Sequence, residues 1–324
     1  MSNEADLLTI EHFETTAVDE RAALREALTS SPKEIPPKYL YDARGSELFE
    51  TLTDLPEYYP TRAERQILRR HSAEIMAEFQ PIELLELGSG ASVKTRMLLE
   101  AMHAEGGRRY TALDVSEDAI REAADTLLSD YQWLEVHGVV ADFHADLSGL
   151  EHDGARVVAF LGGTIGNLYQ EERKRLLQRV RGLVRPGDAV LLGFDLVKGR
   201  DVLEAAYDDS EGRTRRFIMN VFSVMNRDFG ANFEPARFSY RSHWDPKRSW
   251  VEMQLRAKEA HQVDVAGLDL TLDFEAGEHL RAEVSTKFTP ERIRENLAEA
   301  GFALRDVLLD ADERYGLAVA VPAI

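Results

Sequence analysis

The sequence predicts an α/β protein in which a doubly wound, mostly parallel sheet is joined to a second, smaller α+β domain. Between residues 62 and 194, apolar segments of strand length alternate with segments that have an apolar stripe at helical spacing. The apolar run 82–87 leads directly into the glycine pair of Gly88-Ser89-Gly90. Because several strand segments are apolar throughout, the sheet should be parallel and covered by helices on both faces.

Two helices are expected before the alternating region, one at 19–29 and a short one through Leu48 and Leu52. Pro36-Pro37 separates them, since a proline pair cannot continue a helix. Thr61 and Glu64 have the spacing of a capping box at the start of the next helix. The elements that follow are expected in this order: helix 62–79, strand 82–87, helix 92–103, strand 109–114, helix 117–130, strand 134–140, strand 157–161, helix 171–183 and strand 188–194.

After Asp195 the pattern changes, which indicates a second domain. Residues 200–230 have helical periodicity, and alternating apolar positions predict antiparallel strands at 237–243, 249–260 and 263–275. Thr289 and Pro290 start another helix, which Gly301 ends, and strands at 303–309 and 315–321 follow. We therefore assign 61–197 plus 286–324 to the sheet domain, and 1–60 plus 198–285 to the smaller domain.

The composition narrows the range of partners. The 324 residues carry a formal net charge of −19, which disfavours nucleic acid and anionic membranes. The chain has no cysteine, so disulfides and thiolate metal sites are excluded, and the nine histidines show no metal-ligand spacing. The acidic N-terminus lacks the charge pattern of a signal peptide. We expect a cytoplasmic protein with a small-molecule substrate, and no metal, membrane or nucleic-acid partner.

The loop after the strand 82–87 favours an adenosyl ligand. A third glycine, which pyrophosphate binding requires, is missing from Gly88–Val93, so S-adenosyl-L-methionine fits better than a dinucleotide. Asp114 and Asp142 end the next two strands, where carboxylates can accept hydrogen bonds from ribose hydroxyls and an adenine amino group. Phe143 could pack on the adenine, and Lys94 could pair with the ligand's carboxylate. Taken singly, the two aspartates could equally be turn or capping residues, and Lys94 an exposed helix lysine.

Several further motifs occur together with this loop. They are Pro36–Asp42, Leu55–Arg62, Glu86–Gly90, Gly162–Leu168, Asp195–Lys198, Ala206–Asp209 and Glu283–Phe288. The set resembles the histidine Nα-methyltransferases of ergothioneine biosynthesis over nearly the whole chain. The resemblance implies a Rossmann-like class I methyltransferase domain and a substrate-recognition domain. It also implies the trimethylation of L-histidine to hercynine with three molecules of S-adenosyl-L-methionine.

The resemblance also implies a role for each matching residue. Tyr41 and Tyr58 would be the catalytic candidates near the amine and imidazole, with Tyr41 orienting the amine, because an ordinary tyrosine pKa near 10 makes it a weak base. Glu283 and Ser285 would bind the imidazole, since two strand residues at this spacing share a face. The complete implied sets are Gly88, Lys94, Asp114, Asp142 and Phe143 for the cofactor, and Tyr58, Asn167, Tyr207, Met253, Glu283 and Ser285 for the substrate.

Two alternatives remain open at this point. The acceptor could be another amino acid such as tryptophan, although a bulky apolar side chain gains nothing from a buried carboxylate such as Glu283. The chain could also be a non-catalytic S-adenosylmethionine sensor. The presence of Tyr41, Tyr58, Asn167 and Tyr207 together argues against a sensor.

Overall fold

The computed structural model describes residues 7–13, 20–90, 94–142, 145, 147 and 149–323. The chain divides into two compact units. Unit 1 comprises the described residues within 1–17, 62–196 and 288–324, and unit 2 those within 18–61 and 197–287.

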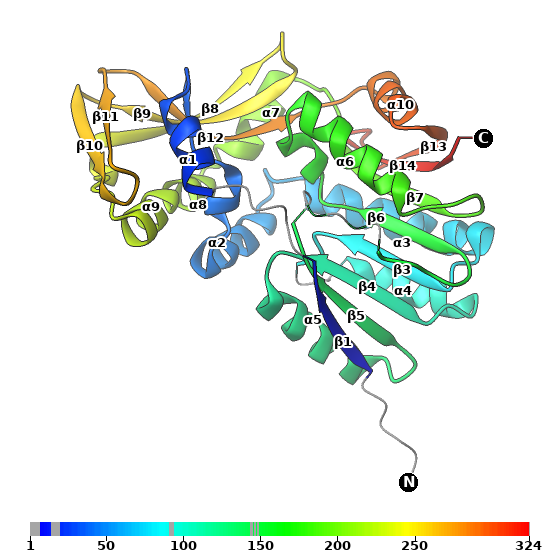
Figure 1. Cartoon of the computed structure of the whole chain (residues 1–324). Helices are drawn as coiled ribbons and strands as arrows, with labels where there is room; N and C mark the ends of the chain where they lie inside the picture. The colour runs from blue at the N-terminus through cyan, green and yellow to red at the C-terminus, as the bar shows by residue number, and fades with distance from the viewer. Residues whose placement is uncertain are drawn as a thin grey trace. The chain divides into compact units, whose positions relative to one another are not determined.

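Unit 1 is built on an eight-stranded sheet with the order β1-β5-β4-β3-β6-β7-β14-β13 (Figure 1). All pairs from β1 to β7 are parallel, whereas β14 is antiparallel to both β7 and β13. This order confirms the doubly wound α/β prediction. The strands are β1 (Leu8–His12), β3 (Glu83–Leu87), β4 (Arg109–Asp114), β5 (Glu135–Val140), β6 (Arg156–Phe160), β7 (Ala189–Asp195), β13 (Phe302–Leu309) and β14 (Tyr315–Pro322).

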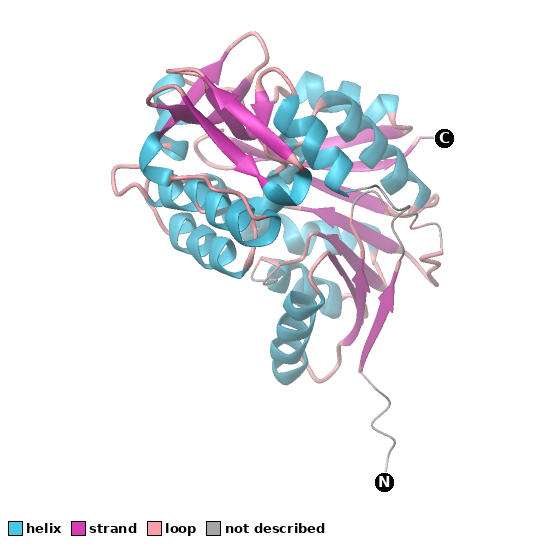
Figure 2. Cartoon of the chain, turned by 60° about the vertical axis from the view of Figure 1, so that its left-hand side comes forward, coloured by secondary structure: helices cyan, strands magenta, loops and turns pink. Residues whose placement is uncertain are grey.

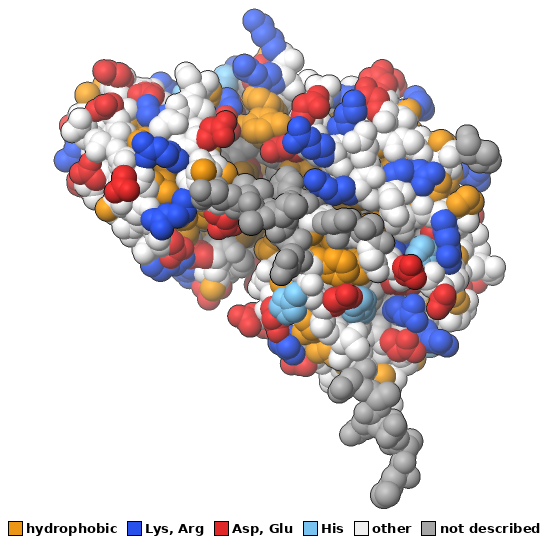
Figure 3. Space-filling model, viewed as in Figure 1, with side chains coloured by type: hydrophobic (Ala, Val, Ile, Leu, Met, Phe, Trp, Pro, Cys, Tyr) orange, Lys and Arg blue, Asp and Glu red, His pale blue; other side chains and the backbone are white. Residues whose placement is uncertain are grey.

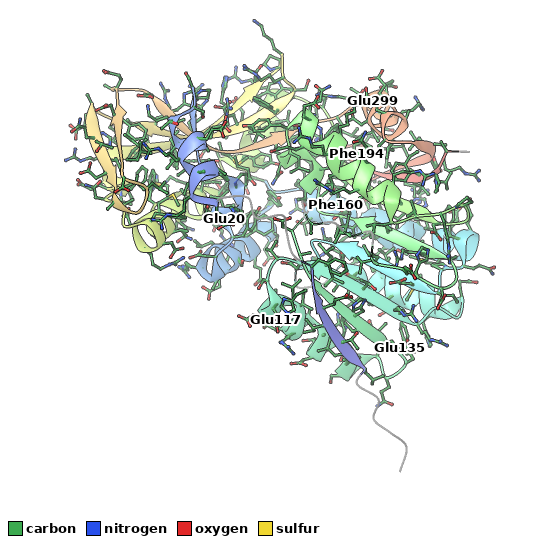
Figure 4. All side chains as sticks on the ribbon, in the orientation of Figure 1. Glu20, Glu117, Glu135, Phe160, Phe194 and Glu299 are labelled. Atoms are coloured by element: carbon green, nitrogen blue, oxygen red, sulfur yellow. The ribbon has the colours of Figure 1, made fainter. Side chains whose placement is uncertain are left out.

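Helices cover both faces of this sheet, as Figure 2 shows. Each face of the sheet packs against its own apolar cluster, because alternate strand residues point to opposite faces. On β6, Val157 and Ala159 belong to the first cluster, and Val158 and Phe160 belong to the second. Phe160 and Phe194, labelled in Figure 4, belong to the same cluster on neighbouring strands. The first cluster contains residues of α3 (Pro60–Phe79), α4 (Thr95–Ala104) and α5 (Glu117–Asp130), and the second contains residues of α6 (Gln170–Gly182) and α10 (Pro290–Glu299).

Unit 2 has a four-stranded sheet, a separate two-stranded sheet formed by β10 and β11, and an apolar core among its described residues. The four-stranded sheet has the order β2-β12-β9-β8, with β12 antiparallel to β9 and parallel to the short β2. Its elements are α1 (Glu20–Thr29), β2 (Lys33–Glu34), η1 (Pro37–Leu40), α2 (Ala43–Thr53), α7 (Arg200–Tyr207), α8 (Arg213–Met219), α9 (Val221–Phe229), η3 (Pro235–Arg237), β8 (Phe238–Asp245), β9 (Trp250–Ala257), β10 (His261–Val265), η4 (Ala266–Leu268), β11 (Leu270–Phe274) and β12 (His279–Thr286).

Three of the expected elements or domain assignments differ from the structure. Residues 1–60 were all assigned to the smaller domain, but β1 pairs with β5 at the edge of the main sheet. The expected strand 263–275 is a hairpin, because the chain turns between β10 and β11 through Asp269, which has φ +47°. The helical stretch 200–230 is three helices, and Gly212, with φ +66°, lies between the first two.

On the face of the molecule drawn in Figure 3, lysine and arginine side chains are interspersed with aspartate and glutamate. Among the described residues, no helix combines the length and apolarity needed to cross a membrane. The same part of the chain contains no group of three or more histidine, aspartate or glutamate side chains placed to hold a metal ion.

Candidate functional site

The glycine loop follows β3 at the point where the strand order of unit 1 reverses, between β3 and β6. Open α/β sheets bind ligands at such switch points. Gly88 and Gly90 have φ of +69° and +47°, a region that side chains with a Cβ rarely adopt. The backbone N–H groups of Gly88 and Ser89 both donate to Leu113 O, at 2.8 and 3.3 Å. A Cβ at Gly90 would have no atom of the described residues outside its chain neighbours within 4 Å, so these residues leave open space at this point of the loop.

The groups around this loop fit an adenosyl ligand. The Ser89 hydroxyl is buried and has no hydrogen-bond partner among the described residues, so a ligand could supply one. Asp114 ends β4, and its carboxylate accepts the N–H groups of Gly90 and Ser116, each at 3.1 Å. Asp142 follows β5 and is half-buried. The predicted adenine neighbour, Phe143, lies outside the described residues.

Glu86 anchors the end of β3 beneath the loop. Its carboxylate accepts hydrogen bonds from Thr95 at the start of α4 and from Tyr110 on β4, the latter at 2.7 Å. Burial raises the pKa of Glu86 to about 7, although both hydrogen bonds oppose the shift. Glu86 therefore ties α4 and β4 to the strand that carries the glycine loop.

Lys94, the candidate for the ligand's carboxylate, is paired with Glu64. Glu64 is fully buried and also accepts the Gly162 N–H at 2.8 and 3.0 Å and the Tyr315 hydroxyl at 2.8 Å. One carboxylate thus orients Lys94 and fixes the loop that follows β6.

The capping-box prediction for Glu64 is wrong. The helix α3 begins at Pro60, one residue before the expected cap, and the Glu64 side chain points into unit 1 rather than back toward Thr61. The three groups that it binds are 30, 98 and 251 residues away in the chain. No local spacing could have revealed them.

Asn167 is the one predicted substrate residue in unit 1. It ends η2 (Thr164–Asn167), a short turn that follows Gly162 and Gly163 after β6, and it is half-buried. Both glycines have positive φ, +80° and +70°, which lets the chain turn sharply from the strand into η2.

In unit 2 the structure brings four predicted substrate residues together. Glu283 on β12 lies directly opposite Met253 on β9, so their side chains share one face of the sheet. Ser285 follows on the same face, and its hydroxyl is 2.9 Å from that of Tyr207 on α7. All four residues are buried, Glu283 to 6% exposure. This is a polar cluster inside a largely apolar core.

A β-bulge in β12 determines which charges lie beside Glu283. Arg281 pairs with Gln254 and Glu283 with Met253, so Ala282 is an extra residue that puts Arg281 and Glu283 on opposite faces. On its own face, Arg281 forms ion pairs with Glu34 and, at 3.0 Å, with Glu252. The bulge therefore separates this arginine from the polar cluster.

The pKa values of the two buried glutamates, Glu283 and Glu252, are consequently shifted in opposite directions. Burial raises the pKa of Glu283 to about 8, and the nearby Lys287 ammonium offsets this only in part. Burial would also raise the pKa of Glu252, but hydrogen bonds from His279 and Arg281 outweigh it and lower this pKa to about 2. Glu283 is thus largely protonated near neutral pH, whereas Glu252 is ionised.

An aromatic cluster containing both catalytic candidates completes this part of unit 2. The ring centroid of Tyr41 is 5.7 Å from Phe49 and 5.3 Å from Phe217, and that of Tyr58 is 6.1 Å from Tyr207. Tyr41 is 42% exposed, yet the protein packed around its hydroxyl and the Glu283 carboxylate raise its pKa well above 10. Tyr41 is therefore protonated at neutral pH and can orient an amine but not deprotonate it.

A family model described as histidine-specific, S-adenosylmethionine-dependent methyltransferase matches residues 20–322. The chain belongs to this family. It is 46% identical over 302 residues to a histidine N-alpha-methyltransferase of Mycolicibacterium smegmatis, covering 93% of this chain and 94% of that protein. A protein of the same name from Mycobacterium tuberculosis is 42% identical over 301 residues, with the same coverage. Ergothioneine biosynthesis protein 1 of Schizosaccharomyces pombe is 28% identical, covering 84% of this chain and 36% of that protein.

Within this histidine-specific methyltransferase, the predicted site residues fall into two groups. Unit 1 carries the glycine loop, Lys94, the two strand-end aspartates and Asn167, and unit 2 carries the remaining substrate candidates. Glu64, expected only in a capping box, and Lys287 were not among the predicted site residues, although both side chains are buried and contact candidate residues. For Lys287 a signal existed, because it lies in the motif Glu283–Phe288 at the same alternate spacing as Glu283 and Ser285.

Proposed function

We propose that this protein transfers three methyl groups from S-adenosyl-L-methionine to the α-amine of L-histidine, forming hercynine as the first step of ergothioneine biosynthesis. The observation that carries the proposal is the buried Glu283 beside Ser285, on the sheet face away from Arg281. A carboxyl group and a hydroxyl can satisfy both imidazole nitrogens. The names of the mycobacterial and fungal relatives support the same substrate and pathway.

In this proposal unit 1 binds the cofactor and supplies Asn167, and unit 2 supplies the other residues that recognise the amino acid. The cofactor would supply a methyl group on a positively charged sulfur. Gly88, Asp114 and Asp142 would bind its adenosyl part, and Lys94, oriented by Glu64, its carboxylate. The chemistry of these donors and acceptors, together with the open space at Gly90, supports the assignment.

The residues of this chain would position the amine rather than form covalent bonds. In each transfer the amine lone pair forms the N–C bond while the C–S electron pair remains on sulfur, and the proton of the resulting ammonium passes to water before the next transfer. Asn167 and Tyr207 would bind the substrate carboxylate, and Tyr58 and the protonated Tyr41 would orient the amine. Placing the reacting atoms about 3–3.5 Å apart accounts for much of the acceleration in such a displacement.

The aromatic cluster would also suit the permanently charged product. Aromatic faces stabilise quaternary ammonium groups by roughly 0.5–2 kcal/mol each. Tyr41 and Tyr58 belong to one connected set of rings with Phe49 and Phe217. A tryptophan acceptor, by contrast, would place an apolar ring against the Glu283 carboxyl. This buried polar group would then lack a hydrogen-bond partner, which weakens binding.

The direct test is incubation of the purified protein with S-adenosyl-L-methionine and L-histidine, followed by mass spectrometry. We expect three successive additions of one methyl group to histidine and none to tryptophan. A protein that binds the cofactor but methylates no amino acid would be a sensor, and preferential methylation of another amino acid would make that compound the substrate. Either result would overturn the proposal.

The raised pKa of Glu283 leads to a pH prediction for product binding. Hercynine has no titratable amine, so only its imidazole and protein groups change charge. We expect the Glu283–imidazole pair to bind best when it shares one proton, which requires a pH above the imidazole pKa of about 6.5 and below the Glu283 pKa of about 8. Affinity should therefore fall roughly tenfold per pH unit above 8, because deprotonation of Glu283 removes the shared proton.

Calorimetric titration with hercynine from pH 6 to 9.5, in the presence of S-adenosylhomocysteine, measures this dependence. The Glu283→Gln variant should bind hercynine more weakly than the wild type. Its affinity should not fall above pH 8, because the amide does not titrate. A wild-type affinity that stays constant from pH 7 to 9.5 would contradict the prediction.

A further inference from the structure

Lys287 places a fully buried ammonium group next to the polar cluster of unit 2. The residue follows β12 and has 0% exposure. Its backbone N–H donates to Ser249 O at 2.7 Å, which extends the antiparallel pairing with the start of β9 by one residue. The side chain therefore continues the face that carries Glu283 and Ser285.

The Lys287 ammonium donates to two residues to which the proposed function gives a substrate role. Its Nζ lies 2.7 Å from the Tyr207 hydroxyl and 2.8 Å from the Ser285 hydroxyl. The same nitrogen is 4.5 Å from the centroid of the Tyr207 ring. Tyr240 on β8 donates its hydroxyl to the Tyr207 backbone carbonyl, so Tyr207 is held at both its backbone and its side chain.

This arrangement determines the direction of the hydroxyl hydrogens. An ammonium can only donate, so both hydroxyl oxygens accept from Lys287 and direct their own hydrogens elsewhere. The two hydroxyls are 2.9 Å apart, and only one of them can donate to the other. The remaining hydrogen points away from the ammonium. The cluster thus offers a hydrogen-bond donor next to a positive charge, which suits a carboxylate.

We propose that Lys287 is a positioning residue that sets the specificity for the carboxylate of the amino-acid substrate. Its ammonium orients the linked Tyr207 and Ser285 hydroxyls so that one of them donates outward, and it supplies the positive charge that favours an anionic group. This inference rests on the proposed function, because it assumes that the cluster binds an amino acid. The inference adds Lys287 to the residues that act on the substrate, whereas the proposed function gives Lys287 no role.

A purely structural role for Lys287 predicts different behaviour. If Lys287 only stabilised the fold, replacing it would lower the melting temperature, and substrate discrimination among folded molecules would be unchanged. A buried charge often contributes no net stability relative to an apolar side chain of similar volume. We therefore expect Lys287→Met to retain or raise the melting temperature.

The test compares Lys287→Met with the wild-type enzyme on L-histidine and on L-histidinamide, which lacks the carboxylate. We expect the KM for histidine to rise about 30-fold, as for the loss of hydrogen bonds from a charged donor. The kcat should fall by less than about threefold, because the lost interaction is made equally in the ground and transition states. The preference for histidine over histidinamide should fall about tenfold or more.

Lys258→Met is the matched control, since Lys258 is an exposed lysine of unit 2 whose ammonium donates to the backbone oxygen of Ala236. It should leave KM, kcat and the histidine preference unchanged. A Lys287→Met enzyme with wild-type KM and wild-type discrimination would overturn the inference. If the wild-type enzyme does not methylate histidine, it is the proposed function that fails instead.

A second variant covers the case in which Lys287→Met does not fold. Glu283→Gln combined with Lys287→Met removes the buried ammonium together with the titratable carboxyl group beside it, so neither group is left without the other. Relative to Glu283→Gln alone, the double variant should bind hercynine about tenfold more weakly, while its affinity for S-adenosylhomocysteine stays the same. Equal hercynine affinities in the two variants would contradict the role of Lys287.

Discussion

Replacing Glu283 with alanine should raise the KM for L-histidine about 100-fold while changing the affinity for S-adenosylhomocysteine by less than about threefold. Loss of a buried, charge-assisted hydrogen bond costs about 1.5–3 kcal/mol, and 1.4 kcal/mol corresponds to a factor of ten. The substitution should weaken binding of the amino acid and not of the cofactor, because Glu283 lies in unit 2 and the glycine loop in unit 1.

Initial rates at saturating cofactor, together with calorimetric titration of S-adenosylhomocysteine, measure the two affinities separately. Glu278→Ala is a suitable control. The Glu278 carboxylate directly precedes β12 and pairs with Lys33, away from the polar cluster. It should leave the KM for histidine unchanged. Equal losses of histidine and cofactor affinity in Glu283→Ala would show that Glu283 supports the fold rather than the substrate.

Replacing Glu64 with alanine should weaken cofactor binding tenfold or more and also destabilise the protein. The change leaves Lys94 without this ion pair and removes the acceptor for the Gly162 N–H and the Tyr315 hydroxyl. Breaking a buried ion pair by removing one partner costs about 3–5 kcal/mol. Part of this loss should appear as a lower melting temperature and part as a weaker complex with S-adenosylhomocysteine.

Glu64→Gln separates the two contributions. The amide keeps one oxygen that can accept the Gly162 N–H, so Glu64→Gln should be more stable than Glu64→Ala. The amide does not restore the negative charge beside Lys94. We expect a near-normal melting temperature with cofactor affinity still reduced. Wild-type cofactor affinity in both variants would mean that Glu64 has no part in orienting Lys94.

The main sheet could be predicted because its signals are local. Apolar runs such as 157–161, separated by segments with helical periodicity, determine both the strands and the layers that cover them. The same reasoning located the glycine loop and the strand-end aspartates, since the carboxyl ends of parallel strands lie at one edge of a sheet. The edge strand β1 could not be predicted in this way, because none of its residues is fully buried and its partner β5 lies more than 120 positions along the chain.

The parts of the site that could not be predicted depend on contacts between distant residues. Glu64 matched a local capping pattern, whereas its partners come from α4, the loop after β6 and β14. Strict alternation along β12 would have put Arg281 next to Glu283 on one face, and only the observed pairing with β9 reveals the bulge. Lys287 had no assigned role because nothing in the sequence indicates that its ammonium reaches a tyrosine 80 residues earlier.

The regular alternation that follows the bulge in β12 also limits how this strand can evolve. Substitutions at 283, 285 or 287 alter one group at a time, so the preferred acceptor could drift gradually while the strand keeps its partner. Loss of one residue between Glu283 and Lys287 would instead shift the phase of alternation, and the carboxyl, the hydroxyl and the ammonium would no longer share one face. The length of this segment should therefore tolerate less variation than its composition.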